Sequence, residues 1–92
     1  MPTSAEAVVQ LPDDVDLHAR PAAQFVRTAL GHAAAITVYA GEREADAKSL
    51  LAVLGLGARR GTQLRLRAEG GEAGPALDAL DALVACVSGF AE

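Results

Sequence analysis

The sequence predicts an α+β fold in which one mostly antiparallel, four-stranded sheet is covered on one face by three helices. Three observations predict it. The chain has 92 residues, a length that suits one domain over residues 1–92 with one hydrophobic core. Segments with strand-like alternation interleave with segments of helical period, in the order β-α-β-β-α-β-α. Since no strand needs a parallel neighbour in this order, an antiparallel sheet is the simplest arrangement.

The first two expected elements are a strand over residues 6–11 and a helix over residues 19–30. Val9 and Leu11 face one side of the strand, and the turn residues Pro12-Asp13-Asp14 end it. The helix has one apolar stripe and ends at Gly31. The stripe consists of Ala22, Phe25, Val26 and Ala29.

The middle of the chain predicts two short strands and a short helix. Residues 34–40 form a strand with Ile36 and Val38 facing inward, and residues 43–47 return as a polar edge strand. A short apolar helix, SLLAVLGL, starts at Ser49. Glycines then break the chain on either side of the adjacent Arg59 and Arg60.

The last two elements are a strand over residues 63–69 and an amphipathic helix over residues 75–88. In the strand, apolar residues alternate with arginines, which predicts one face in contact with water. In the helix, Asp78 and Asp81 are expected to face outward, and Cys86 is expected to be a small buried apolar residue. The residues expected to face inward are Leu77, Leu80, Leu83, Val84 and Val87.

Composition excludes several classes of protein. The net charge is −4 and there is no basic block, which argues against nucleic-acid binding. No apolar run is long enough for a membrane span, no signal peptide is recognisable, and the single cysteine favours the cytoplasm. The histidines and the cysteine lack a metal-ligand spacing. We therefore expect a cytoplasmic monomer without metal or bound cofactor.

The stretch Asp16–Ala23, DLHARPAA, carries the chemistry. His18 falls at the N-cap of the first helix, where free backbone N–H groups and partial positive charge bind anions. Ala19 and Arg20 offer such N–H groups, and Pro21 suits the first helical turn. The Arg20 side chain adds charge-assisted hydrogen bonds to phosphate, and a neutral imidazole is a nucleophile. The pattern predicts transient phosphorylation of His18.

Two motifs resemble the HPr family, the histidine-containing phosphocarriers of the bacterial phosphoenolpyruvate:sugar phosphotransferase system. They are LHARPAA, followed by Phe25-Val26, and AKSLLAVLGLGARRGTQLRL over residues 47–66. The resemblance covers essentially the whole chain and implies an open-faced β-sandwich. It further implies that Enzyme I phosphorylates His18 on Nδ1, that Arg20 binds the phosphate, and that a IIA component receives it. Such a protein is a stoichiometric carrier and not an enzyme.

Ser49 has two expected roles. As the residue before a short apolar helix it is an N-cap that satisfies an otherwise unpaired N–H group. In the resembling family, the serine at this position is phosphorylated in many bacteria by a dedicated ATP-dependent kinase that regulates carbon use. Added phosphate would repel an acidic partner, so an HPr serine kinase/phosphatase is a further candidate partner.

Leucines of the short helix are candidates for partner docking. A short helix cannot bury every side, and either Leu50 or Val53 is expected to face the core. By resemblance, Leu51 and Leu54 match an apolar patch that docks on Enzyme I and IIA, and Arg27 matches a basic rim. The complete set of docking candidates is Ala23, Arg27, Leu50, Leu51 and Leu54.

The chain departs from the resembling family just before the histidine. The family usually has a small or amide residue, then glycine, then leucine or isoleucine, whereas this chain has Val15-Asp16-Leu17. We expect Asp13, Asp14 and Asp16 to form a solvated acidic loop. Asp16 would raise the free energy of a nearby phosphate, although exposed charges are well screened.

Several other functions remain open at this point. A carrier of the same type could serve a nitrogen-related branch or a dihydroxyacetone kinase. A small acylphosphatase-like enzyme has a similar element order and an arginine near phosphate, but it needs no histidine at a helix start. A purely regulatory binding module would act through Ser49 and its apolar helix, and His18 would then be dispensable.

Overall fold

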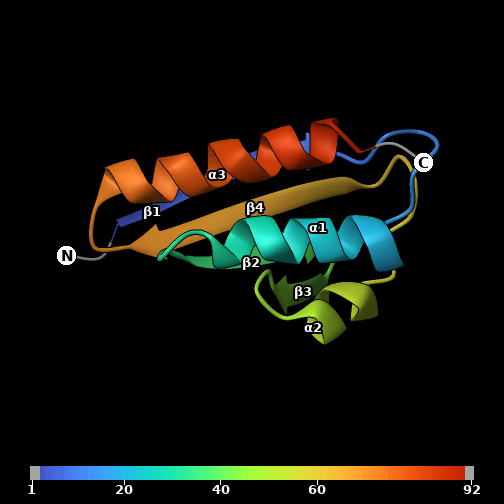
Figure 1. The fold of residues 1–92 in the computed structure, drawn as a ribbon, viewed down its shortest axis with the longest axis horizontal. Helices are drawn as coiled ribbons and strands as arrows, with labels where there is room; N and C mark the ends of the chain where they lie inside the picture. The colour runs from blue at the N-terminus through green and yellow to red at the C-terminus, as the bar shows by residue number, and fades with distance from the viewer. Residues whose placement is uncertain (1–2, 91–92) are drawn as a thin grey trace.

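The computed structural model describes residues 3–90 and confirms the predicted element order (Figure 1). Alternating segments form the strands, and segments with apolar residues three and four apart form the helices. In chain order the elements are β1 (Thr3–Gln10), α1 (Ala19–Leu30), β2 (Ala35–Ala40), β3 (Arg43–Asp46), α2 (Leu50–Gly55), β4 (Gln63–Gly70) and α3 (Ala73–Ser88). No helix among these is long and apolar enough to cross a membrane.

The four strands form one sheet in the order β1-β4-β2-β3, with every neighbouring pair antiparallel. The helices cover one face, as predicted for an open-faced sandwich, and β3 is the predicted polar edge strand. In the β1–β4 pair, Gln10 lies opposite Gln63. The segment that leaves β1 and the segment that enters β4 therefore start side by side, although they are far apart in the sequence.

The core lies between the inner face of the sheet and the apolar stripes of α1 and α3. The predicted stripe of α1 is confirmed, because all four of its residues are buried and Phe25 is completely so. Alternation in β4 is also confirmed, with Leu64, Leu66 and Ala68 buried and Arg65 exposed. Burial of this apolar surface is the main contribution that stabilises the fold.

The predicted inner face of α3 is partly wrong. Leu77 is 52% exposed, and Val84 and Cys86 are half-buried. The residues that do face the core are Ala76, Ala79, Leu80, Leu83 and Val87. They recur every three to four positions along one line, whereas Leu77 is turned by about 100° from Ala76. Ala76 and Ala79 are buried although they are small, whereas the larger Leu77 is exposed, so residue size was a misleading guide to the direction of the face.

The largest differences from the predicted boundaries are at the starts of β1 and α3, and the other boundaries agree to within one residue. β1 begins at Thr3, three residues earlier than expected, because β4 pairs with it as far as Thr3 opposite Gly70. α3 begins at Ala73, so that Pro75 lies inside its first turn. Proline is tolerated there because the N–H groups of the first turn have no partner within the helix.

Candidate functional site

His18 is the N-cap of α1 and its side chain is exposed. Its backbone is extended (φ −109°, ψ −159°), and its carbonyl accepts the N–H of Ala22 at 2.8 Å. The N–H groups of Ala19 and Arg20 precede this first helical bond, and Pro21 has none. Within residues 3–90, the His18 side chain makes no capping hydrogen bond. This helix end therefore keeps its positive partial charge open to an anion.

An open hollow of about 410 Å³ lies beside His18. One wall comes from the loop that precedes α1, and the other comes from the end of α2 and the loop that follows it. The lining residues are Asp16, Leu17, His18, Leu54, Gly57, Ala58 and Arg59. The fold thus brings the predicted nucleophile to the same hollow as Leu54, one of the predicted docking residues.

Arg59 is the lining residue that the sequence reasoning missed as a candidate. In the sequence it is one of two adjacent cations between glycines, and nothing local distinguishes it from Arg60. The structure distinguishes them, because Arg59 lines the hollow whereas Arg60 contacts Asp16. Gly57 and Gly61 bracket this turn with positive φ angles of 63° and 74°, a backbone region that favours glycine.

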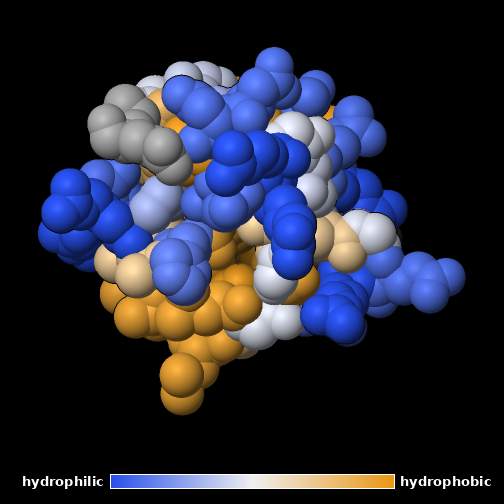
Figure 2. Space-filling view, turned by 90° about the vertical axis from the view of Figure 1, so that its right-hand side faces the viewer, coloured by the Kyte–Doolittle hydropathy of each residue, from blue (hydrophilic) through white to orange (hydrophobic). Residues whose placement is uncertain are grey.

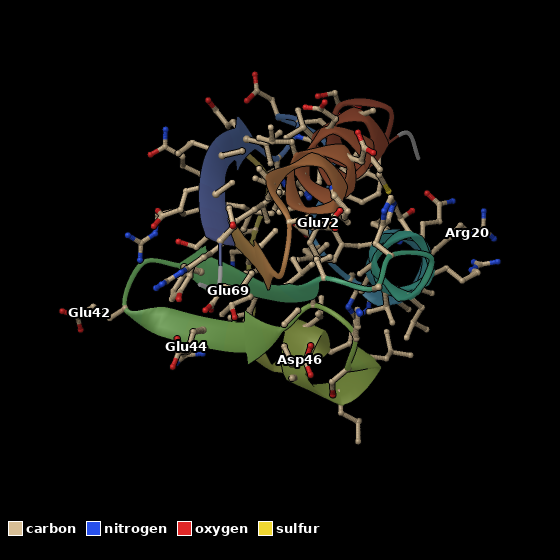
Figure 3. All side chains as sticks on the ribbon, turned by 90° about the vertical axis from the view of Figure 1, so that its left-hand side faces the viewer. Arg20, Glu42, Glu44, Asp46, Glu69 and Glu72 are labelled. Carbon is tan, nitrogen blue, oxygen red and sulfur yellow. The ribbon has the colours of Figure 1, made fainter. Side chains whose placement is uncertain are left out.

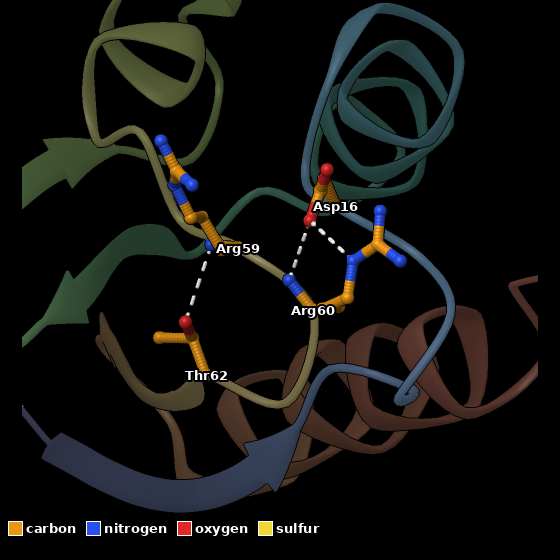
Figure 4. A network of polar contacts seen from close by, with 4 residues as sticks. All are labelled: Asp16, Arg59, Arg60 and Thr62. Atoms are coloured by element: carbon orange, nitrogen blue, oxygen red, sulfur yellow. Dashed lines mark hydrogen bonds and ion pairs between the residues drawn. The ribbon is translucent and has the colours of Figure 1, made fainter.

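Asp16 is bound within the protein and is not part of a freely solvated acidic loop. Its Oδ1 atom accepts the backbone N–H of Arg60 at 2.7 Å and lies 3.4 Å from Nε of the same residue (Figure 4). These two hydrogen bonds, the backbone one first, hold the pKa of the Asp16 carboxyl below its ordinary value of 3.8. The expectation of a solvated acidic loop holds for the exposed Asp13 and Asp14. It was wrong for Asp16, because its partner Arg60 lies 44 residues further along the chain.

Leu17 anchors the same loop. Its side chain is 3% exposed, and its N–H donates to the carbonyl of Ala58 at 3.0 Å. Arg59 in turn donates its N–H to Oγ1 of Thr62 at 3.2 Å, which stabilises the turn that carries both arginines (Figure 4). Backbone and side-chain contacts together fix the two walls of the hollow relative to each other.

Cationic side chains of α1 lie on the side of the molecule away from an acidic edge. Arg20 and Arg27 are exposed and lie about two turns apart, with the half-buried Ala23 between them on the same helix face. In Figure 3 the labelled Arg20 lies beside α1. The labelled Glu42 and Glu44 lie away from it, at the edge of the sheet formed by β3. The exposed face of α1 therefore carries two cations, on a chain of net charge −4.

The N-terminus of α2 is capped by Ser49, as predicted. Its Oγ accepts the N–H of Ala52 at 3.3 Å. Val53 is the residue of this helix that faces the core, whereas Leu50 is 41% exposed and Leu51 is 84% exposed. Leu54 is half-buried. The two alternatives for the core-facing residue are thereby resolved in favour of Val53.

An apolar surface lies over α2 at the same end of the molecule as the hollow. Figure 2 views the end at which α1 begins, and apolar surface gathers at its lower part, where Figure 1 places α2. Leu50 and Leu51 are exposed large apolar residues of this helix. Exposed apolar surface of this kind marks sites of protein–protein contact. Among residues 3–90, no cluster of His, Cys, Asp and Glu side chains is arranged to hold a metal ion.

Comparison with known proteins gives the family. Residues 5–85 match the family model described as the PTS HPr component phosphorylation site. The chain is 42% identical over 72 residues to a phosphocarrier protein HPr of Vibrio cholerae, which covers 78% of this chain and 85% of that protein. It is 49% identical over 61 residues to a multiphosphoryl transfer protein of Xanthomonas campestris pv. campestris, covering 66% of this chain and 7% of that much longer protein.

A solved structure agrees with these sequence matches. The fold superposes on a crystal structure of a phosphocarrier protein HPr from Bacillus anthracis with a TM-score of 0.83 and 32% identity, covering 92% of this chain and 98% of that one. Sequence, fold and the helix-terminal histidine point the same way: the chain belongs to the HPr phosphocarrier family of the phosphotransferase system.

Proposed function

We propose that the chain is a stoichiometric, cytoplasmic phosphoryl carrier whose phosphorylated residue is His18. Enzyme I donates the phosphoryl group, which moves from the donor to Nδ1 of His18 as the bond to the donor breaks. A IIA component of a sugar permease then accepts it. The observation that carries the proposal is the exposed imidazole at the uncapped N-terminus of α1, beside an open hollow.

The start of α1 supplies what a phosphohistidine needs. The N–H groups of Ala19 and Arg20 and the positive end of the helix stabilise the phosphoryl oxygens. The exposed Arg20 guanidinium adds charge-assisted hydrogen bonds. Ala19 has a small side chain, which lets a phosphoryl donor approach the backbone closely. Because the site is exposed, the phosphoryl group remains accessible to the next acceptor.

The α2 surface is the proposed docking surface for both partners. Leu51 is 84% exposed, and Leu54 connects this apolar surface to the hollow beside His18. Leu50 extends the surface, and Ala23 and Arg27 form its rim on α1. Enzyme I and IIA would bind here one after the other, so the contact must be transient, which a small apolar patch with a charged rim allows.

Ser49 is the proposed site of regulatory phosphorylation by an HPr serine kinase/phosphatase. It lies at the start of the helix that carries the docking leucines. A phosphate there would be tolerated by the helix N-terminus, but its charge would lie beside the docking surface. Phosphorylation of Ser49 would therefore weaken partner binding without unfolding α2.

The experiment that tests the carrier function is phosphoryl transfer from phosphoenolpyruvate through Enzyme I, followed by mass spectrometry. We expect the chain to gain one phosphoryl group that is labile in acid and stable in base. His18→Ala is expected to gain none, and Leu51→Ala is expected to gain one with a raised KM for the chain. Absence of the adduct under conditions that charge another HPr would reject the proposal.

Two further arms separate the alternatives. Release of phosphate from an acyl phosphate by the chain alone would show an acylphosphatase-like enzyme. Charging by the Enzyme I of a nitrogen-related or dihydroxyacetone kinase branch, and not by that of the sugar branch, would assign the chain to that other branch. Retention of the adduct in His18→Ala would reject His18 as the acceptor.

A further inference from the structure

Asp16 and Arg60 are a pair to which the carrier chemistry assigns no role. They come from the loop before α1 and the loop before β4, and they meet at 2.7 Å through the Arg60 backbone N–H. We propose that this pair is a positioning clamp that holds His18 and Arg59 at the two walls of the same hollow for phosphoryl transfer. The proposal rests on the proposed carrier function of His18.

The clamp acts on the residues immediately before the histidine. Oδ1 of Asp16 accepts the N–H of Arg60, and the N–H of Leu17 donates to the carbonyl of Ala58 at 3.0 Å. The His18 N–H donates to the Asp16 carbonyl at 2.8 Å. Asp16 and Leu17 are therefore bound to the loop before β4, and His18 is bound to Asp16. This chain of contacts transmits the position of the Arg60 turn to His18.

Because Asp16 binds only one of the two adjacent arginines, Arg59 and Arg60 have different roles. Asp16 binds the backbone and the Nε of Arg60, and the opposite charges of this pair compensate each other. Arg59, whose N–H is held by Thr62, lines the hollow instead. Asp16 thus adds little net negative charge beside the phosphoryl group, and the cation that remains directed to the hollow is Arg59.

The main contribution of the clamp is geometric and not a large gain in stability. Asp16 and Arg60 side chains are 42% and 61% exposed, and exposed ion pairs stabilise folded proteins very little. Phosphoryl transfer depends strongly on alignment, because small displacements of a reacting group slow a reaction by large factors. Loss of the clamp should therefore reduce the rate of transfer more than it affects folding.

The test is steady-state phosphorylation of the chain by Enzyme I, with the chain as varied substrate. For Asp16→Ala we expect kcat to fall about tenfold with KM within about twofold, since alignment and not docking is lost. Arg60→Ala keeps the backbone N–H that Asp16 accepts, so it should retain most of the rate. The double variant should be no slower than Asp16→Ala alone, because the only contact that Arg60→Ala removes already requires Asp16. Asp16→Asn should retain most of the rate, because its amide oxygen still accepts the Arg60 N–H.

Asp14→Ala is the matched control. Asp14 is an exposed acid in the same loop, so its removal changes the net charge equally without breaking the clamp. Its kinetic constants should equal those of the unaltered chain. The proposal would be overturned if Asp14→Ala slowed transfer as much as Asp16→Ala, if Arg60→Ala slowed transfer further in the Asp16→Ala background, or if only KM changed.

Amide hydrogen exchange provides a readout that does not depend on transfer. The Arg60 amide should exchange at least about tenfold faster in Asp16→Ala than in the unaltered chain, with Asp14→Ala unchanged. Equal exchange in the unaltered chain and Asp16→Ala would overturn the clamp. If the exchange result is as expected but the unaltered chain takes no phosphoryl group, it is the carrier function of His18 that fails.

Discussion

The N-termini of α1 and α2 are capped differently. At α2, the Ser49 hydroxyl accepts the N–H of Ala52 and so caps the helix end. At α1, the N-cap His18 makes no capping hydrogen bond within residues 3–90, and its ring is exposed. Both ends carry the partial positive charge of a helix N-terminus, but only the α1 end leaves it open to a ligand.

The cap stabilises the N-terminus of α2, whereas the absence of a side-chain cap leaves the N-terminus of α1 able to bind an anion. A helix of six residues such as α2 is too short to be stable in isolation and gains from a cap. α1 has twelve residues and a fully buried apolar stripe, so its packing can tolerate an uncapped end. The longer helix therefore remains stable with the open terminus that anion binding requires.

The largest expected effect comes from converting the α1 end into a copy of the α2 end. His18→Ser introduces a side chain that can accept an N–H of the first turn. We expect acid-labile phosphoryl uptake to be lost completely, while stability rises by about 0.5–1 kcal/mol, a Tm increase of roughly 2–8 °C. Mass spectrometry after incubation with Enzyme I and thermal unfolding measure the two quantities.

His18→Ala is the control for this substitution. It removes the imidazole without adding a cap, so uptake is lost and stability does not rise. A fall of Tm in His18→Ser relative to His18→Ala would contradict the assignment of the α1 terminus as an open helix end.

The second-largest effect is expected from removing the Ser49 cap of α2. Ser49→Ala removes the hydrogen bond to the Ala52 N–H, which should destabilise the protein by about 1 kcal/mol, or roughly 4–8 °C in Tm. Phosphoryl uptake by His18 should remain within about twofold. Ser49→Asn, which keeps a capping oxygen, should restore most of the lost stability, and failure to do so would mean that Ser49 does not act as a cap.

The smallest effect is a difference in acid response between the two ends. The pKa of Asp16 is lowered in the folded protein by the Arg60 hydrogen bonds. Its contribution to stability is therefore present above its ordinary pKa of 3.8 and is lost as pH falls through the lower folded value. The Ser49 cap contains no titrating group. Below pH 3.8 the Arg60 amide resonance should shift with protonation of Asp16, whereas that of Ala52 should stay constant.

This titration is followed by NMR between neutral pH and pH 2. Asp16→Asn is the matched variant, and its Arg60 amide resonance should not move with pH. An Arg60 resonance that moves equally in Asp16→Asn would show that a group other than Asp16 controls it.

Much of the fold and part of the site follow from local pattern. The stripe of α1, the alternation of β4 and the capping by Ser49 were predicted because each depends on residues within one or two turns. Leu77 was placed wrongly because the sequence shows which residues are apolar but not which line of α3 lies closest to the sheet. There, small alanines were buried and the larger leucine was exposed.

What the sequence by itself determined was the order of the elements, the histidine at the start of α1 and the serine at the start of α2, since helix ends are specified by short-range chemistry. Only the tertiary structure decided that Arg60 binds Asp16 and that Arg59 reaches the hollow beside His18. The reason is strand pairing. The end of β1 lies against the start of β4, so the loop after β1 meets the loop before β4. Nothing in the sequence of either loop indicates that they are neighbours.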